Sequence, residues 1–250
     1  MFESDTAYDA FMGRYSRRLA PVFADFAGVP GGSSVADVGA GTGALTTELA
    51  SRGLRVSAAD PSPQFVESLS ARLSEVNAQV APAESLPWAD ETFDAALAQL
   101  VVAFMSDAPA GVREMRRVVK PGGTIAVCMW DRQGMEMLAA VQRAQRALGG
   151  DSPTAEARVM YRTPEEIESL FGEGFDDMRT DALEADASYS GYDEFWNALL
   201  GGAGPAGAWV ASLDDDGREA ARAEVHRQLG EPAGAFTLRA KAWGTRATRA

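Results

Sequence analysis

The 250-residue chain is long enough for one large α/β domain, and an apolar content of 46% is ample for a hydrophobic core. Its formal charge of −13 argues against nucleic acid or an anionic membrane as a partner, because such partners bind to fields of Lys and Arg. One cysteine and one histidine exclude a disulfide within the monomer and a zinc site of the usual nitrogen and sulfur ligands, so we expect no metal.

The sequence predicts a cytoplasmic protein. The first 20 residues carry charges throughout, and no window approaches the 18 apolar residues of a membrane-spanning helix. We expect a small molecule as partner, with neither nucleic acid nor membrane. Whether the protein is a monomer or a homodimer stays open.

An amino-terminal helix is predicted before the first strand. Apolar residues recur at helical spacing at Tyr8, Phe11, Met12 and Tyr15. The helix either docks on the domain and covers it, or forms a lid over a ligand with Arg14 reaching an anionic group. The two interpretations are compatible.

The stretch from residue 34 to residue 46 reads as a buried strand, a glycine turn and the start of a helix. Asp37 interrupts the apolar strand near its end, where an ionisable group is costly unless it binds something. Gly39, Gly41 and Gly43 allow positive φ and close approach of a ligand, and the following helix offers free backbone N–H groups. The pattern predicts a polar ligand above the turn.

A second acid strengthens this prediction. Glycines alone are compatible with a structural turn that binds nothing. Asp60, however, follows the apolar run of residues 56–59, about one βαβ unit further on, at the position where a ribose hydroxyl would lie.

Strands and helices alternate through the first half of the chain. This alternation, with apolar strands, predicts a parallel sheet with helices on both faces, and ligands of such sheets bind at the carboxyl ends of the strands. The predicted strands are residues 34–38, 55–59, 78–81, 93–100 and 124–130, and the predicted helices start at 44, 63 and 111.

The second half is predicted to add a cap and a last strand. Helices are expected over residues 133–148, 163–171 and 214–229, a strand over 175–184, and a helix with a mobile glycine-rich loop over 189–209. Residues 236–243 alternate apolar and polar, which predicts one antiparallel strand, and residues 244–250 are expected to fray.

Four motifs in order resemble the class I S-adenosylmethionine-dependent methyltransferases, specifically the small-molecule type with a domain like that of ubiquinone and menaquinone biosynthesis enzymes. The motifs are VADVGAGTG at 35–43, AADPS at 58–62, AESLPWADETFDAA at 83–96 and RVVKPGGT at 117–124. The resemblance covers residues 25–130, with a weaker continuation to the end.

The resemblance implies a Rossmann-like, doubly wound α/β fold. Its sheet would have seven strands, mostly parallel with the last strand antiparallel, plus a small helical cap. We expect a single methyltransferase domain over 1–250, divided into an amino-terminal lid helix (1–24), a cofactor-binding core (25–131), further helices and a strand (132–185), a helical cap insertion (186–230), and the last strand and tail (231–250).

The cofactor implied by the resemblance is S-adenosyl-L-methionine. The glycine turn would lie under its methionine part, Asp60 would bind both ribose hydroxyls, Pro61 would lie beside the adenine, and the backbone at Ala83 would recognise the edge of the adenine. The family has an acid just before this alanine; here the residue is Pro82, and Glu84 is the nearest substitute. The full predicted set is Arg14, Asp37, Gly39, Ala40, Gly41, Gly43, Asp60, Pro61, Ala83, Glu84, Gln99 and Leu100.

The predicted reaction is methyl transfer to a small molecule by in-line displacement in an apolar pocket. Aromatic residues of the cap favour a flat or apolar substrate, although they could equally hold the cap on the domain. The predicted substrate-binding residues are Tyr15, Phe104, Trp130, Tyr192 and Trp196. No residue is assigned as a general base; Tyr15, His226 and the carboxylates are candidates.

Two other functions stay open. Gly39, Gly41 and Ala44 also satisfy the glycine pattern of a nicotinamide-dependent oxidoreductase, in which Asp60 would again bind a ribose. The chain has no Tyr-x-x-x-Lys for hydride chemistry, which argues against that alternative. A protein that binds S-adenosylmethionine without catalysis is the other possibility.

Overall fold

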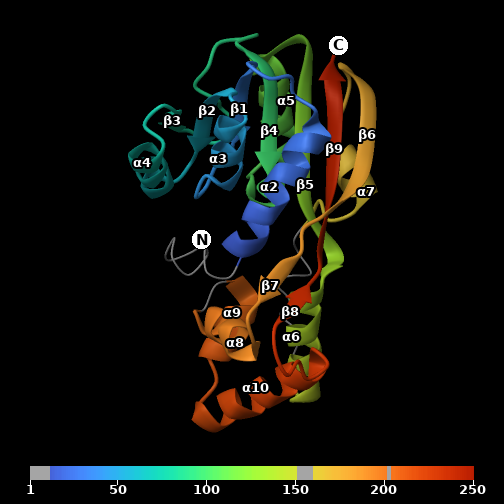
Figure 1. The fold of residues 1–250 in the computed structure, drawn as a ribbon. Helices are drawn as coiled ribbons and strands as arrows, with labels where there is room; N and C mark the ends of the chain where they lie inside the picture. Colours follow the sequence, from blue (N-terminus) through green and yellow to red (C-terminus); the bar gives the residue numbers. More distant parts are fainter. Residues whose placement is uncertain (1–11, 151–159, 202–203) are drawn as a thin grey trace. The chain divides into compact units, whose positions relative to one another are not determined.

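A computed structural model describes residues 12–150, 160–201 and 204–250 of the chain (Figure 1). The predicted helix positions Tyr8 and Phe11 lie outside the described residues. The chain divides into two compact units. The sheet unit consists of Leu19–Asp131, Met160–Leu183 and Ala242–Ala250, and the helical unit consists of Met1–Arg18, Arg132–Val159 and Glu184–Lys241.

A seven-stranded sheet is the core of the sheet unit. Its strand order is β3-β2-β1-β4-β5-β9-β6, mostly parallel, and β9 runs opposite to β4 in Figure 1. This confirms the predicted fold class. The strands are β1 (Ser34–Val38), β2 (Arg55–Asp60), β3 (Asn77–Val80), β4 (Phe93–Gln99), β5 (Val119–Met135), β6 (Phe175–Glu184) and β9 (Ala240–Arg249).

The central strands bring the predicted site residues to one edge of the sheet. β1 pairs in parallel with β2 and with β4, so that Val38 lies opposite Ala59 and Asp37 lies opposite Leu97. The apolar residues of β1 and β4 are almost completely buried, as expected for strands covered on both faces. Asp37, Asp60 and Gln99 therefore stand at neighbouring carboxyl ends.

Helices cover both faces of the sheet. Figure 1 shows the part of α2 (Gly13–Ala27) that starts at Leu19 in front of the sheet and α5 (Ala108–Val118) behind it. α3 (Ala44–Ser51) packs on β2, and α4 (Pro63–Arg72) packs on β2 and β3. The remaining elements of the unit are the short 3-10 helix η1 (Val102–Phe104) and α7 (Pro164–Glu168).

Side-chain caps explain where three of these helices begin. The Ser62 hydroxyl accepts a hydrogen bond from the Phe65 N–H at 3.4 Å, and the Asp107 carboxylate accepts one from the Ala110 N–H at 2.9 Å. Thr163 caps α7 in the same way, as its sequence pattern predicted, although the helix ends at Glu168 and not near residue 171.

The helical unit is built from α6 (Glu136–Ala147), α8 (Tyr192–Leu200), α9 (Gly204–Ala211) and α10 (Asp215–Gln228), with a two-stranded sheet of β7 (Ala187–Tyr189) and β8 (Phe236–Leu238). α9 packs on α8 and on α6, and α10 packs on α6. Among the described residues, none of the helices combines the length and the apolar character needed to cross a bilayer.

The prediction of one helix and a mobile loop over residues 189–209 was wrong in its second part, because a second helix, α9, starts at Gly204. Glycine disfavours a helix by about 1 kcal/mol per residue, which is why the sequence argued against one. Val210 and Ala206 are buried, and this burial against α8 and α6 outweighs the poor helix propensity.

The last predicted strand is in fact two strands. Residues 236–238 form β8, and β9 begins at Ala240 after a break at Arg239. The Arg239 N–H donates to a Glu136 carboxylate oxygen at 2.8 Å, and the Glu136 N–H donates to the Arg239 carbonyl at 3.1 Å. The backbone at Arg239 is thus bound to the first turn of α6 and is not available for the ladder.

The expected fraying of residues 244–250 was also wrong, because β9 continues to Arg249. Thr245 and Ala247 are buried, so residues whose small side chains looked poorly anchored belong to the core of the sheet unit. Similarly, β5 continues to Met135, so the helix predicted from residue 133 starts only at Glu136.

Candidate functional site

The glycine turn follows β1 at the carboxyl edge of the sheet. The Gly39 and Ala40 N–H groups both donate to the Ala59 carbonyl, at 2.8 and 3.1 Å, which ties the turn to the end of β2. Gly39, Gly41 and Gly43 have φ values of 73°, 53° and 79°, in the left-handed region that favours glycine. The three glycines are therefore required by the backbone conformation.

The surroundings of the three glycines differ. A Cβ atom added at Gly39 would lie 2.4 Å from Val101 Cγ2, and one added at Gly43 would lie 2.4 Å from Leu69 Cδ1. At Gly41 an added Cβ would meet no protein atom within 4 Å. Gly39 and Gly43 thus allow close packing inside the protein, whereas Gly41 faces open space where a ligand can approach the backbone.

Asp60 binds the turn from the end of β2. One carboxylate oxygen accepts from the Gly41 N–H at 2.8 Å, and the other accepts from the Ser62 N–H at 2.9 Å. The residue is 7% exposed. Burial raises the pKa of the Asp60 carboxyl, and the two backbone hydrogen bonds act in the opposite direction. Asp60 thus holds the shape of the turn at Gly41.

Asp37 is a second buried acid at the same edge. The Thr46 hydroxyl, in the first turns of α3, donates to its carboxylate at 2.5 Å. Burial and, to a lesser extent, the charge of Asp60 raise the pKa of Asp37 to about 7, against the hydrogen bonds from Thr46. Thr46 was not among the residues predicted from the sequence, in which the only signal for it was a hydroxyl at the start of the helix that follows the turn.

The end of β4 supplies the next part of the site. Leu100 has a φ of 62°, which is uncommon for a residue other than glycine, and its N–H donates to the Cys128 carbonyl at 2.9 Å. Such backbone conformations concentrate at functional sites. Gln99 is the last residue of β4, and Phe104, in η1, is 64% exposed.

The segment after β3 lies beside Asp60. The Ala81 N–H donates to the Asp60 carbonyl at 3.1 Å, and Ala83 is buried. A Glu84 carboxylate oxygen accepts from the Asp107 N–H at 3.0 Å, at the start of α5. Pro61 is exposed. The structure thus brings most of the predicted cofactor-binding residues to one edge of the sheet, where their role stays a prediction.

Arg14 and Tyr15 belong to the helical unit. Arg14 forms an ion pair with Glu194, donates to the Ser188 carbonyl and lies 4.5 Å from the ring centre of Tyr189. Tyr15 is fully buried, and its hydroxyl accepts from the Tyr189 hydroxyl at 3.2 Å. Burial raises the pKa of Tyr15, so its phenol stays protonated at neutral pH.

Two predicted substrate-binding aromatics also belong to the helical unit. Tyr192 stacks on Phe195 and Trp196, with ring centres 5.9 and 6.4 Å apart, and Trp196 is 6% exposed. The Tyr192 hydroxyl donates to the Arg222 carbonyl at 2.6 Å. These contacts fit the alternative that the aromatics hold the cap together. Their contact with a substrate stays a prediction.

Trp130 lies in the sheet unit near the end of β5. It is 6% exposed, and its carbonyl accepts from Arg162 Nε at 3.3 Å. Arg162 is buried, and it also donates to the Asp131 carbonyl at 3.1 Å. The Trp130 side chain is thus mainly a core residue in this structure.

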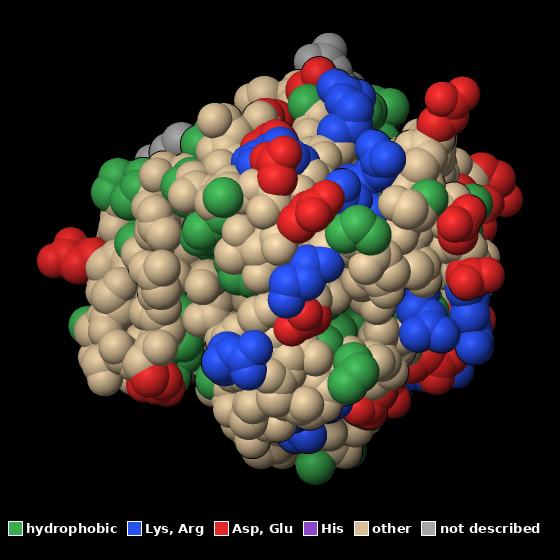
Figure 2. Space-filling model, turned by 90° about the horizontal axis from the view of Figure 1, so that it is seen from above, with side chains coloured by type: hydrophobic (Ala, Val, Ile, Leu, Met, Phe, Trp, Pro, Cys, Tyr) green, Lys and Arg blue, Asp and Glu red, His purple; other side chains and the backbone are tan. Residues whose placement is uncertain are grey.

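Several basic side chains of the sheet unit form ion pairs. They include Arg52 with Asp25, Arg117 with Asp90, and Lys120 with Asp94. On the face drawn in Figure 2, Lys and Arg side chains lie among Asp and Glu side chains. Within the described residues, no three His, Cys, Asp or Glu side chains gather as metal ligands.

Comparison with known proteins agrees with this geometry. Residues 36–127 match the family model described as a methyltransferase domain. An uncharacterized protein of Mycobacterium tuberculosis is 29% identical over 87% of this chain and 80% of its own length. An uncharacterized methyltransferase of the same organism is 36% identical over 52% of each chain.

A solved structure shares the fold. Phosphoethanolamine N-methyltransferase 2 of Haemonchus contortus, in complex with S-adenosyl-L-methionine, has a TM-score of 0.60 and 16% identity, covering 98% of this chain and 57% of that one. At this identity the likeness shows the fold alone. The methyltransferase domain matched over residues 36–127 supports the class that the sequence motifs predicted, a class I S-adenosylmethionine-dependent methyltransferase.

Proposed function

We propose that this protein transfers the methyl group of S-adenosylmethionine to a small-molecule acceptor by in-line displacement. One observation carries the proposal: Gly41 faces open space at the carboxyl edge of the sheet, where the ends of β1 and β2 also bring the buried acids Asp37 and Asp60. Ligands of open α/β sheets bind at this edge.

Asp60 fits the ribose of this cofactor. Each of its oxygens accepts one backbone N–H, and a carboxylate oxygen has two lone pairs, so acceptor capacity remains for two hydroxyl groups. Hydrogen bonds from hydroxyls to a carboxylate are charge-assisted and stronger than neutral ones. The ribose would then lie over the end of β2, with Gly41 beside it.

Asp37 fits the positively charged amino-acid end. Burial raises the pKa of its carboxyl, and none of the groups that perturb this pKa is a cation. An ammonium group nearby would favour the ionised form. In this proposal Gly39, Ala40, Gln99 and Leu100 surround the methionine part. Arg14 is paired with Glu194 in the helical unit, and its contact with the cofactor carboxylate stays a prediction.

Methyl transfer needs little chemical participation from side chains of the protein. The cofactor supplies a methyl group already activated on a sulfonium. The protein holds the acceptor in line with this group, and an apolar pocket without water favours loss of the sulfonium charge. Phe104 is exposed beyond the end of β4 and is available to contact the acceptor. Tyr15 is a poor candidate for a general base, because burial keeps its phenol protonated.

Gly41 offers a test with a matched control. Gly53 also has a positive φ, 75°, and open space at the position of an added Cβ. Gly41→Ala and Gly53→Ala therefore carry a similar backbone strain, about 1–2 kcal/mol each. We expect calorimetry to show that Gly41→Ala weakens binding of S-adenosylmethionine and its demethylated product at least tenfold, while Gly53→Ala leaves it unchanged.

Two outcomes contradict the proposal. Equal affinity in both variants would mean that the ligand does not lie over Gly41. Tight binding of NAD by the wild-type protein, with no response to S-adenosylmethionine or its demethylated product, would instead favour an oxidoreductase. Circular dichroism of both variants checks that the fold persists.

A further inference from the structure

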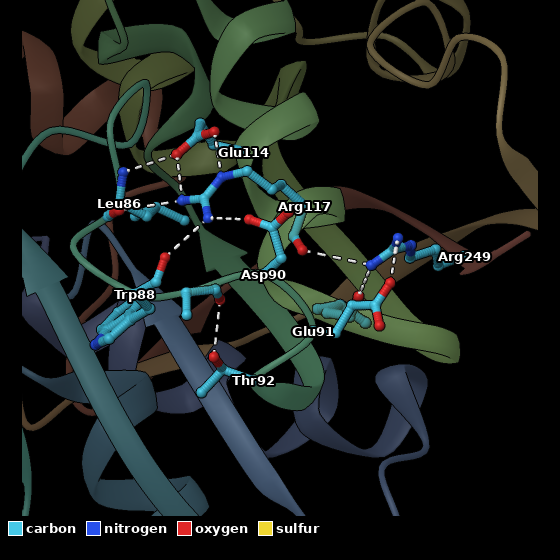
Figure 3. A network of polar contacts seen from close by, with 10 residues as sticks. Leu86, Trp88, Asp90, Glu91, Thr92, Glu114, Arg117 and Arg249 are labelled. Atoms are coloured by element: carbon cyan, nitrogen blue, oxygen red, sulfur yellow. Dashed lines mark hydrogen bonds and ion pairs between the residues drawn. The ribbon is translucent and has the colours of Figure 1, made fainter.

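The segment between β3 and β4, residues 81–92, has neither helix nor strand of its own. Its conformation therefore depends on contacts with neighbouring elements. One helix, α5, provides most of these contacts through two side chains that are one turn apart, Glu114 and Arg117 (Figure 3). Glu114 and Arg117 together form the α5 clamp.

Arg117 uses every donor that a guanidinium has. Its five N–H groups match five hydrogen bonds, of which Nη2 donates to the Leu86 carbonyl at 3.1 Å and Nη1 donates to the Trp88 carbonyl at 2.8 Å. The other three bonds go to Asp90 Oδ1 at 2.8 Å and to both oxygens of Glu114 at 2.7 and 2.8 Å. A lysine has three donors on one nitrogen atom and cannot form these five hydrogen bonds.

Glu114 completes the clamp from the other side. While one oxygen binds Arg117 Nε, the other accepts from the Leu86 N–H at 3.0 Å. Both backbone polar groups of Leu86 are thus held by the same ion pair. Hydrogen bonds from Arg117 lower the pKa of Glu114, so the pair stays charged at neutral pH.

The same helix also contacts the start of the segment. The Asp107 N–H, at the amino end of α5, donates to Glu84. A Cβ atom added at Gly111 would lie 3.3 Å from Ala83 Cβ and 2.6 Å from Met105 Sδ, so the helix packs closely here. From Gly111 to Arg117 the helix rises about 9 Å. One rigid element therefore sets the whole segment from Ala83 to Asp90.

The segment of residues 81–92 borders the proposed cofactor site on the side of β3. The neighbouring strands run in the order β1, β2, β3, and adjacent strands lie about 4.8 Å apart. A ligand that crosses Gly41 after β1 and reaches Asp60 after β2 next meets the residues after β3, which are Ala81 to Glu84. With the ribose at Asp60, the group at this end is the purine base.

We infer that Arg117 is a positioning residue for base selectivity: the α5 clamp holds residues 83–90 so that Ala83 and Glu84 present a fixed edge to the adenine. This inference rests on the proposed function. The glycine turn and Asp60 are held by hydrogen bonds that do not involve the α5 clamp. A loosened clamp should therefore weaken contacts with the base of the ligand and leave contacts with the ribose unchanged.

The test compares two nucleosides that differ only at the base edge. Calorimetry measures the affinities of S-adenosylhomocysteine and of S-inosylhomocysteine, in which an oxo group replaces the adenine amino group. We expect the wild-type protein to prefer the adenine compound, and Arg117→Lys to reduce this preference at least fivefold. A general loss of stability would lower both affinities together and leave their ratio unchanged.

Arg249→Lys is the matched control. Arg249 belongs to the same network, where it binds Glu91 at 3.0 Å and the backbone carbonyls of Val119 and Arg117, and none of these hydrogen bonds goes to residues 86–90 (Figure 3). Its substitution should leave the affinity ratio unchanged. If Arg117→Lys fails to fold by circular dichroism, Glu114→Gln loosens the clamp with a smaller change, and the same reduction in the ratio is expected.

The outcomes separate the inference from the proposed function. A wild-type protein that binds neither compound overturns both. A wild-type protein without preference for adenine, or an unchanged preference in the folded Arg117 or Glu114 variant, overturns the inference alone. If the Arg249 variant reduces the affinity ratio as much as the Arg117 variant does, the inference is also overturned.

Discussion

Asp60 is expected to stabilise the glycine turn and to bind the ribose of the cofactor. The substitution Asp60→Asn separates these two effects. In the wild-type protein its two oxygens accept from the Gly41 and Ser62 N–H groups. The asparagine amide keeps one acceptor oxygen and places an NH2 group where the second acceptor was. One backbone N–H therefore loses its partner, and the ribose loses a charged acceptor.

The two losses have different magnitudes. A buried N–H without its acceptor costs about 1–3 kcal/mol of stability. We expect the lower part of this range, because burial raises the pKa of Asp60 and removal of the buried charge offsets part of the loss. Losing a charged hydrogen bond to the ribose costs a further 1.5–3 kcal/mol of binding, which is about a 10- to 150-fold weaker affinity.

Asp94→Asn is the control, because this carboxylate also accepts a backbone N–H, that of Ser34 at 2.8 Å, but at the opposite end of β4. Urea unfolding without ligand measures the stability of both variants, and calorimetry measures the affinity for S-adenosylhomocysteine. Both variants should lose stability, and only Asp60→Asn should lose affinity. If Asp60→Asn binds as tightly as the wild-type protein, Asp60 does not bind the ribose.

The remaining predictions concern the buried acid and the buried phenols. Because the folded pKa of Asp37 is raised to about 7, above the unfolded value of about 3.9, the folded state binds more protons between these pH values, and stability should fall as pH rises through them. Asp37→Asn should remove this contribution, seen as a flatter dependence of the urea midpoint on pH; an unchanged slope would contradict it. Tyr189→Phe should cost about 1 kcal/mol in thermal unfolding, because it removes the hydroxyl that donates to Tyr15. Adding Tyr15→Phe to this variant should lower the stability by less than the loss of a second full hydrogen bond. If the losses of stability of the two single variants simply add, the two hydroxyls do not interact.

The order of strands and helices could be predicted from the sequence because each element depends mainly on its own residues. Apolar runs such as residues 34–38 and 93–99 suit strands buried on both faces, and Thr163 followed by proline and two acids marks a helix start. Asp37 and Asp60 stood out as ionisable residues at the ends of apolar strands. Local chemistry was sufficient for these predictions.

Errors occurred where distant contacts override local preference. The glycine-rich residues 204–211 are helical because they pack on α8 and α6. The strand near the carboxyl terminus breaks at Arg239 because Glu136, about a hundred residues earlier, binds its backbone. Neither partner is adjacent in sequence, so no periodicity could indicate the contact.

The sequence by itself determined the class of fold, the family and the residues at the carboxyl edge of the sheet, because strand pattern and glycine spacing are local properties. Only the tertiary structure distinguished Gly41, open to a ligand, from Gly39 and Gly43, which pack on Val101 and Leu69. Only the tertiary structure joined Arg117 to the segment after β3. The physical reason is the same in both cases: space and hydrogen-bond partners are set by residues that the fold brings together from distant parts of the chain.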